Sequence, residues 1–534
     1  MIRSATPEVL VVGAGPTGLS LAITLRRLGI AVRVVDRAGR PSAVSKALAM
    51  WSGSLEALHG MEVVDAFLAA GQRLRALSVG QGGRELASLP VGAGIDSPYP
   101  FPLLLPQSRT EAILGARLEA LGVAVERGVE LTGLAQDAAG VTADLRHADG
   151  RVEAASVGYL VGCDGARSAV RHALGVAFEG YTEPGVYLLG DVRVDGGDLD
   201  QRSIYLRWNR GGAVALFPFG DAVWRVFAER EPASAAPDDA PPTLAELQAH
   251  LDRFGPPGIR LRDPGWLSAF RINERLAARY RVGRCFLAGD AAHIHSPAGG
   301  QGMNTGIQDA VNLGWKLGYA LRGAGDTEVL LDSYEPERRP IARAVIDGSA
   351  RRLHVAFHRG DAARLARNLA VSALGRIPAV QRKLQVDLSE TEIVYRDGPL
   401  VALGGAPRRA GRTRVGGRAR DARFRDADGA ERRLWPELSA LRHCLLVFED
   451  AGRPMPLERA LDRAGDRVAV LRLDPARDPG LVARTRYRQR GPGWVLIRPD
   501  QVVAARGTEA DLARLDRYLD GAVRARPDIP LDEV

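Results

Sequence analysis

The stretch VLVVGAGPTGLSLAITLRRLGIAVRVVDR, residues 9–37, decides the fold of the amino-terminal part of the chain. An apolar run rich in valine predicts a buried strand, and an amphipathic pattern over about 17–28 predicts the helix that follows it. The turn between them has the spacing G-x-G-x-x-G. Its first glycine allows a tight turn, its second lets a pyrophosphate approach the backbone, and its third lets helix and strand pack closely.

An acid completes this pattern. A second apolar run ends at Asp36, 18 residues after the last glycine of the turn. Its carboxylate can accept a hydrogen bond from a ribose hydroxyl but would repel a 2′-phosphate, so the site favours FAD or NAD over NADP. Regular strand–helix units do not continue after about residue 60, which favours FAD over a nicotinamide dehydrogenase.

Length and composition set the broad class of protein. With 534 residues, 46% of them hydrophobic, the chain can form roughly two to four domains. The net charge of +8 comes from arginines interspersed with acids, so no nucleic-acid partner is expected. No apolar run is long enough to span a membrane, and no signal peptide is evident. Cys163, Cys285 and Cys444 are far apart and form no disulfide framework. A soluble cytoplasmic protein is expected.

Two later stretches repeat the strand–turn–helix layout. In YLVGCDGARSAVR, residues 159–171, a strand is followed by Asp164, with Ser168 placed to cap a helix. In RCFLAGD, residues 284–290, a strand ends at an acid before a glycine-rich loop and a helix over about 306–321. Three strand ends with an acid can therefore converge on one elongated dinucleotide.

The stretch GDAAHIHSPAGGQGMNTGIQDA, residues 289–310, admits other interpretations. His293 and His295 are two residues apart and lack a clear third ligand, so we expect hydrogen-bonding roles and no metal. Ser296 has no G-x-S-x-G elbow around it, which argues against a hydrolase.

Farther upstream in the chain, Ser108 and Glu111 have the spacing of a capping box, which predicts the start of a helix.

Between about 176 and 280 the pattern alternates, which predicts an antiparallel sheet. Tyr205 and Arg207 share one face of a strand, and Phe217 and Phe219 share a face of the next. The two phenylalanines are either core residues or the wall of an aromatic pocket.

From about residue 400 onward, the order of predicted elements is β-α-β…β-β-α. Because it holds only Cys444, this region cannot perform dithiol exchange, and we expect a scaffold or assembly role.

The three strand-end motifs resemble the fingerprints of the FAD-dependent aromatic hydroxylases, the para-hydroxybenzoate and phenol hydroxylase group, over about 6–350. The resemblance implies an α/β fold in four parts. These are a Rossmann-like FAD-binding domain formed by 1–175 with 281–355, an inserted antiparallel-sheet substrate domain over 176–280, a helical linker region over 356–399, and a thioredoxin-like C-terminal domain over 400–534 that lacks CxxC.

The resemblance also assigns roles to residues. Asp290 would bind the ribityl region of the flavin, and the Pro297 backbone would lie near its reacting edge, whereas no catalytic side chain is identified. Lys46 and Gly53 stand where many members carry arginine. Tyr205, Arg207, Phe217 and Phe219 are the substrate candidates. The cofactor-binding candidates are Gly13, Gly15, Pro16, Thr17, Gly18, Asp36, Arg37, Lys46, Gln107, Asp164, Gly289, Asp290, Pro297, Gly299, Gly300, Gly302, Met303 and Asn304.

The activity that the resemblance implies is an FAD-dependent monooxygenase. It would use NADPH or NADH and O₂ to hydroxylate an aromatic substrate, phenolic or polycyclic and polyketide-like, through a flavin C4a-hydroperoxide. A helix that starts after the glycine loop would direct its positive end at the flavin. The partners are then a small aromatic molecule and O₂, with no membrane and with a homodimer left open. Two alternatives remain: a flavin oxidase or reductase without oxygen insertion, and a non-catalytic flavin-binding protein. A halogenase is disfavoured because no W-x-W-x-I-P stretch is present.

Overall fold

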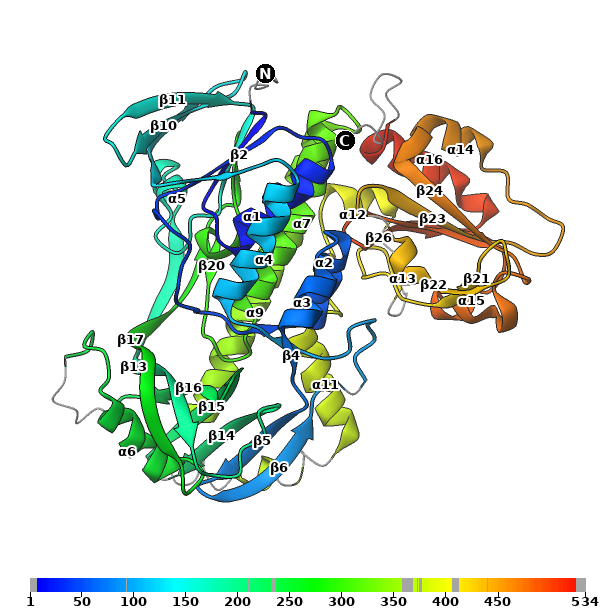
Figure 1. The fold of residues 1–534 in the computed structure, drawn as a ribbon. Coiled ribbons are helices and arrows are strands. Elements are labelled where there is room, and N and C mark those ends of the chain that lie inside the picture. Colours follow the sequence, from blue (N-terminus) through cyan, green and yellow to red (C-terminus); the bar gives the residue numbers. More distant parts are fainter. Residues whose placement is uncertain are drawn as a thin grey trace.

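The computed structural model describes residues 7–524 except 93, 210, 232–236, 358–367, 372, 374–376, 406–412 and 439. Part of the predicted helical linker and the end of the predicted C-terminal domain therefore lie outside the described residues. The fold is α/β, as predicted, with helices and sheets arranged around a long central helix, α7 (Figure 1).

A parallel sheet forms the amino-terminal region. β1 is buried at all four positions, as expected for a strand covered on both faces. Pro16 is the first residue of α1, where its missing N–H leaves no bond unmade. The strand order is β18-β19-β12-β1-β2-β8, and only the β18–β19 pair is antiparallel. The elements are β1 Val9–Val12, α1 Pro16–Arg27, β2 Val32–Asp36, β8 Val125–Arg127, β12 Tyr159–Gly162, α5 Ala169–Ala173, β18 Arg281–Val282 and β19 Cys285–Leu287.

Helix α7, Gly302–Leu321, packs along α1. Glycines allow this approach, because a Cβ at Gly314 would lie 2.7 Å from the Thr24 side chain. The sequence predicts a start near 306, but the helix begins at Gly302, since its glycine-rich first turn carries little apolar periodicity. The other helices of this region are α2 Ser52–Gly60, α3 Val64–Ala70, α4 Gln107–Ala120, α8 Thr327–Asp332 and α9 Tyr334–Phe357.

The predicted capping box at the start of α4 is wrong. Pro106 is the N-cap residue, and no side-chain bond caps the helix. Glu111 instead accepts a hydrogen bond from Gln107 Nε2 at 2.8 Å, and Ser108 lies 3.1 Å from the Ser45 hydroxyl. The extended backbone of the proline sets the start of this helix, so the capping residues are free for other contacts.

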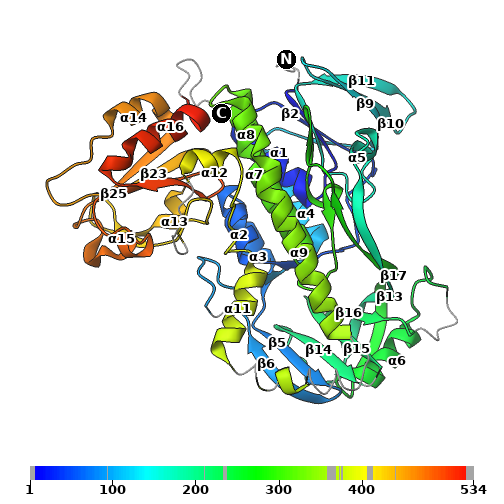
Figure 2. The same ribbon diagram turned by 180° about the vertical axis from the view of Figure 1, so that it is seen from behind.

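An eight-stranded sheet forms the second region, in the order β20-β17-β13-β16-β15-β14-β5-β6. Its five central strands come from the predicted range 176–280, and β5, β6 and β20 join from outside it. α6 covers one face, and α9 runs from the parallel sheet to the other face (Figure 2). The elements are β5 Ala76–Gln81, β6 Arg84–Pro90, β13 Phe178–Asp195, β14 Ser203–Asn209, β15 Gly212–Gly220, β16 Val223–Glu229, α6 Leu244–Phe254, β17 Arg260–Ala277 and β20 His293–Ile294.

The C-terminal unit, which we define as 413–524, has a four-stranded sheet in the order β24-β23-β25-β26. β23 and β24 are parallel, and the other pairs are antiparallel. The order of the elements along the chain is the predicted β-α-β…β-β-α. The largest apolar cluster includes residues of both this unit and the parallel sheet. The main elements are β23 His443–Phe448, α14 Glu458–Ala464, β24 Val468–Leu473, β25 Gly493–Ile497, β26 Val503–Gly507 and α16 Leu512–Ala522.

Shorter elements complete the fold. Three of the sheets have only two or three strands. Within the described ranges, every helix is too short or too polar to cross a bilayer. The remaining elements are β3 Ala49–Met50, β4 Gln72–Arg73, β7 Leu103–Leu104, β9 Val129–Gln136, β10 Val141–His147, β11 Val152–Val157, α11 Pro378–Ser389, α12 Pro399–Gly404, β21 Arg423–Arg425, β22 Glu431–Arg433, α13 Leu434–Glu437 and α15 Val482–Arg486.

Candidate functional site

The glycine turn after β1 is packed tightly at two positions and open at the third. A Cβ on Gly13, whose φ is +104°, would lie 2.4 Å from the Cys163 carbonyl oxygen. One on Gly18 would lie 1.9 Å from the Gly13 carbonyl oxygen. One on Gly15 would meet no atom within 4 Å. The protein itself therefore requires two of the glycines, and the space at the third suits a pyrophosphate that approaches the backbone.

The acid at the end of β2 is fixed against this turn. Asp36 accepts hydrogen bonds from the backbone N–H groups of Ala14 at 2.7 Å and Ala38 at 2.8 Å. Arg127 lies 3.6 Å from the same carboxylate, and Arg37 is exposed beside it. Asp36 is thus held next to the open Gly15 position, where a ribose hydroxyl can reach it.

Asp164, which follows β12, has one carboxylate oxygen without a hydrogen-bond partner in the described part of the chain. Asp164 Oδ2 accepts hydrogen bonds from the N–H groups of Ala169 at 2.6 Å and Val170 at 3.2 Å, whereas Oδ1 is buried without a partner. Burial raises the pKa of this carboxyl group. The Ser168 hydroxyl accepts from Arg171 N–H, which confirms the predicted helix cap. An unsatisfied buried oxygen beside the glycine turn fits a bound ligand that supplies the missing donor.

The Gly289 turn after β19 is held in place by the Asp309 carboxylate of α7. Gly289 N–H donates to Asp309 Oδ2 at 3.1 Å, and the same carboxylate lies 2.6 Å from both His293 Nε2 and Arg338 Nε. His293 is therefore a buried hydrogen-bonding residue. Across the described ranges, no group of three histidine, cysteine or acidic residues is placed to hold a metal ion. Asp290 remains exposed on the other side of the turn.

The loop before α7 is tied to β3. Trp51 Nε1 donates to the Gly299 carbonyl oxygen at 2.8 Å. Asn304 accepts from Trp51 N–H at 2.7 Å and donates to the carbonyl oxygens of Ala49 at 2.9 Å and Gly300 at 2.7 Å. Both side-chain N–H donors of Asn304 are thus used within the protein. A cofactor that needs a donor from Asn304 can therefore obtain it only from the backbone N–H.

That backbone belongs to the free end of a twenty-residue helix. Gln301 is the N-cap of α7 and makes no side-chain cap bond. The N–H groups of Gly302, Met303 and Asn304 lie in the first turn, where a helix has no internal acceptors. This end therefore carries a partial positive charge of about half an elementary charge and is suited to the electron-rich edge of a bound ring.

Arg352 and Arg225 are site residues that sequence reasoning missed. Arg352, on α9, donates to the Ala298 carbonyl oxygen at 2.9 Å and so supports the loop from behind. Arg225, on β16, pairs with Asp191 at 2.8 Å and donates to the Lys46 carbonyl oxygen at 2.9 Å. A buried arginine within the alternating apolar stretch VWRVFAE was the available signal for Arg225.

The structure also explains the residues around Lys46. The Lys46 side chain is exposed, and Gln107 forms hydrogen bonds in both directions with the Ala47 backbone, each at 3.1 Å. The glycine at position 53 has a packing reason, because a Cβ there would lie 3.0 Å from the Glu390 carbonyl oxygen. A side chain at this position would require the neighbouring Glu390 backbone to shift.

The substrate candidates separate onto opposite faces of the eight-stranded sheet. Phe217 and Ala298 of the loop pack against the same apolar cluster, and Phe219 lies in the adjoining cluster that contains Leu48. Tyr205 packs instead in the cluster of α6, and its hydroxyl accepts from Asp200 N–H. The same alternation directs Arg207 away from the loop, where it donates to the backbone and hydroxyl oxygens of Ser78. Tyr205 and Arg207 are therefore not part of the site that we describe.

Two titratable groups flank the turn before Pro297. Glu274 accepts from Ser296 N–H at 3.3 Å, and its second oxygen is buried without a partner in the described ranges. Burial, with the nearby Glu183 carboxylate, raises the pKa of Glu274 to about 7. Burial lowers the pKa of His295 to about 4, so its imidazole is neutral. Both groups are therefore uncharged between about pH 4 and pH 7.

Comparison with known proteins gives three similarities. Residues 6–349 match the sequence family described as FAD binding domain. The chain is similar to 6-methylpretetramide 4-monooxygenase from Streptomyces rimosus, with 37% identity over 528 residues that cover 96% of this chain and 93% of the relative. It is also similar to pentachlorophenol 4-monooxygenase from Sphingobium chlorophenolicum, with 34% identity over 349 residues, 65% of this chain and 64% of the relative. Among solved structures, the OxyS anhydrotetracycline hydroxylase from Streptomyces rimosus has a TM-score of 0.76 and 31% identity, covering 97% of this chain and 99% of that one.

Proposed function

The chain belongs to the FAD-binding family of flavin-dependent aromatic monooxygenases, and from this premise we propose that it hydroxylates a polycyclic phenol of the polyketide type. The observation that carries the substrate class is the aromatic pair Phe217 and Phe219 on the sheet face toward the α7 loop. Flat aromatic rings pack well against such side chains. The relatives named for tetracycline-type compounds align with nearly the whole chain, which supports a polycyclic substrate over a single ring.

FAD fits the residues that surround the glycine turn. We assign the pyrophosphate to the open Gly15 position and a ribose to Asp36. We assign the ribityl region to Asp290 and the ring edge to the free N–H groups at the start of α7. When bound, FAD supplies the redox chemistry: it accepts a hydride from NADH or NADPH and activates O₂.

The chain's own residues would bind, orient and exclude water. The apolar side chains around Phe217 and Phe219 keep solvent from the space beside the loop. Trp51 and Arg352 fix the loop carbonyl groups, so that the turn from Pro297 to Gly300 keeps one conformation. The positive end of α7 favours negative charge at the ring that it faces. The choice of NADH or NADPH, the cytoplasmic location, the homodimer and the four-part domain division remain predictions.

The test is a turnover assay under ¹⁸O₂ with a panel of polycyclic and single-ring phenols. We expect substrate-stimulated NAD(P)H oxidation and a product that gains one labelled oxygen atom, with polycyclic phenols the better substrates. Label that enters only from H₂¹⁸O, or hydrogen peroxide as the sole product with every phenol, would contradict oxygen insertion. Equal turnover of single-ring phenols would contradict the substrate class alone.

The Phe217→Ala variant tests where the substrate lies. Loss of one aromatic contact should raise KM for the preferred phenol about fivefold and divert more NAD(P)H to hydrogen peroxide. FAD content should stay unchanged, because Phe217 packs on the substrate side of the loop. Unchanged KM and unchanged peroxide release would move the substrate away from this face.

A further inference from the structure

A chain of buried polar groups leads away from the flavin motif through the protein. It starts at Asp309, which accepts from Gly289 N–H and pairs with Arg338. Arg338 Nη1 donates to the Tyr395 hydroxyl at 3.3 Å, and the same hydroxyl accepts from Asn312 Nδ2 at 3.3 Å. Asp309 and Asn312 both lie on α7, one turn apart, so the chain follows the helix whose free end faces the flavin site.

The far end of this chain is a buried cluster of charges. Lys316 Nζ donates to Glu337 at 2.7 Å, and Arg498 donates to both Glu337 oxygens at 2.7 and 2.8 Å. Arg498 also pairs with Asp500. Asn312 Nδ2 lies within hydrogen-bond distance of Glu337, at 2.8 Å, and of Asp500, at 3.1 Å, and shares its two hydrogens among these oxygens and the Tyr395 hydroxyl. None of the four charged side chains is more than 5% exposed. Two cations and two anions balance, and burial makes each of them dependent on the others.

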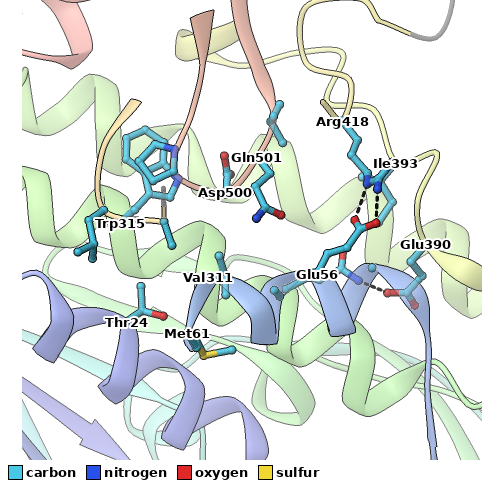
Figure 3. A pocket seen from close by; sticks show the side chains of 18 of the residues that line it. Thr24, Glu56, Met61, Val311, Trp315, Glu390, Ile393, Arg418, Asp500 and Gln501 are labelled. Atoms are coloured by element: carbon cyan, nitrogen blue, oxygen red, sulfur yellow. Dashed lines mark hydrogen bonds and ion pairs between the residues drawn. The ribbon is translucent and has the colours of Figure 1, made fainter. Parts of the chain in front are cut away.

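Half of the cluster comes from the C-terminal unit. Arg498 and Asp500 lie in the turn between β25 and β26. The turn is connected to α7 through the Asn312–Asp500 hydrogen bond and to α9 through the Arg498–Glu337 pair. Asp500 also lines a cavity beside α7 (Figure 3). The cavity has a volume of about 70 Å³ and is lined by Trp315 and Val311 of α7. A second ion pair, Glu56 with Arg418, closes the other side of the cavity.

The charges of the cluster are maintained by their neighbours. Burial alone would raise the pKa of Glu337, but Arg498 and Lys316 hold it below its usual range. Asp309 is in the same situation: burial acts to raise its pKa, whereas Arg338 and His293 lower it. Removal of any one charge would leave an unbalanced buried ion, which the structure must relieve by moving or by taking up a proton.

We propose that Arg498 and Asp500 are positioning residues of the flavin site, and that the C-terminal unit acts through them to hold α7 and the Gly289 turn in place. The link runs from Asp500 through Asn312 and Tyr395 to Arg338 and Asp309. The proposal rests on FAD lying at the start of α7, as in the proposed function, but not on the identity of the substrate. It assigns a role in cofactor binding to a unit that has no dithiol pair and lies apart from the glycine motifs.

The experiment compares two single variants with the double variant that restores charge balance. Arg498→Met leaves an excess negative charge in the cluster, and Asp500→Asn leaves an excess positive charge. Each should weaken FAD binding to the purified holoenzyme about tenfold, which corresponds to about 1.4 kcal/mol. Arg498→Met combined with Asp500→Asn is balanced again, so it should lose clearly less affinity than the two single effects added together. The readout is the FAD dissociation constant from flavin fluorescence, measured without substrate.

Two further variants test whether a loss of FAD affinity comes from the proposed link or from a general disturbance of the C-terminal unit. Tyr395→Phe removes the bridging hydroxyl without changing any charge, and it should weaken FAD binding by about threefold, a smaller loss because one neutral hydrogen bond is removed. The matched control is Asp520→Asn, which breaks the exposed pair with Arg463 within the C-terminal unit and should leave FAD affinity unchanged.

Several results would overturn the proposal. Folded single variants that bind FAD as tightly as the parent would remove the link. A double variant whose loss equals the sum of the single losses would mean that the turn acts by packing alone. Weakened binding in Asp520→Asn would mean that any change in this unit suffices. Because no arm measures hydroxylation, failure of the proposed substrate class would leave these outcomes unaffected.

Discussion

The two faces of the eight-stranded sheet both carry aromatic residues, but they differ in their connections to other segments. On the α6 face, Tyr205 packs with Trp224, and Arg207 bonds to Ser78 of the same sheet. On the opposite face, Arg225 reaches the Lys46 backbone, and Glu274 reaches Ser296 of the loop. On the face opposite α6, buried polar side chains thus bond to segments outside the sheet. The α6 face stabilises the sheet, whereas the other face also holds the segments that form the site.

Arg225→Met, on the face opposite α6, should have the largest effect on stability and on FAD content. The substitution leaves the Asp191 carboxylate buried without its partner and releases the Ser45–Lys46 backbone. Loss of one member of a buried pair costs about 3 kcal/mol or more, so we expect that decrease in the free energy of unfolding, measured by urea denaturation. FAD content should fall as well. Arg225→Met combined with Asp191→Leu should recover part of the stability but not the FAD content. A loss below about 1 kcal/mol would show that the pair is not buried in solution.

Glu274→Gln should produce an intermediate, pH-dependent effect. The folded protein holds a proton on Glu274 up to a pKa of about 7, whereas the unfolded chain releases it near the usual value for a glutamate. The stability that this raised pKa contributes is fully present below the unfolded value and is lost as pH rises through 7. The neutral glutamine avoids this loss. Between pH 5 and pH 8 the variant should therefore gain about 2 kcal/mol relative to the parent protein.

The measurement is urea unfolding of both proteins at several pH values. Glu390, whose pKa burial also raises to about 7, titrates in both proteins and cancels in the difference. The other groups near Glu274 are Glu183, Asp347 and His354, and they are likewise unchanged by the substitution. A difference that stays constant from pH 5 to pH 8 would show that Glu274 is ionised throughout.

Tyr205→Phe should have the smallest effect. It removes a hydroxyl that accepts one hydrogen bond, from Asp200 N–H at 2.8 Å, so stability should fall by about 1 kcal/mol or less. KM for the preferred phenol should not change, in contrast to Phe217→Ala on the opposite face. Steady-state kinetics of the two variants side by side provide the check. A raised KM in Tyr205→Phe would place substrate on the α6 face and reverse the assignment.

Local patterns predicted most of the secondary structure. The glycine spacing identified the turn after β1, and Ser168 was correctly identified as a helix cap. The alternating stretches predicted the central strands of the eight-stranded sheet. The capping box at Ser108 and Glu111 failed because the helix starts earlier, with Pro106 as its N-cap. Ser108 then contacts the distant Ser45, and Glu111 bonds to Gln107 within the helix.

Contacts between segments that lie far apart in the sequence determined the features that local patterns did not predict. Nothing near Asn304 in sequence indicated that its side chain would bond to Trp51 and Ala49. A strand pattern also shows which residues share a face, but not which face is directed toward the loop. Thus Phe217 and Tyr205 were equal candidates until the sheet was packed between α6 and α9.

The sequence by itself determined the strand–glycine–helix units, because close approach of backbone to a dinucleotide requires glycines at fixed spacing. The resemblance of its three motifs to known fingerprints indicated the family of flavin-dependent aromatic monooxygenases. Only the tertiary structure decided that the turn of Arg498 and Asp500 meets α7 and that Arg225 holds the Lys46 segment. The physical reason is burial. A charge removed from water must find an opposite charge or a hydrogen-bond partner in space, and the partner that it finds is set by how the elements pack.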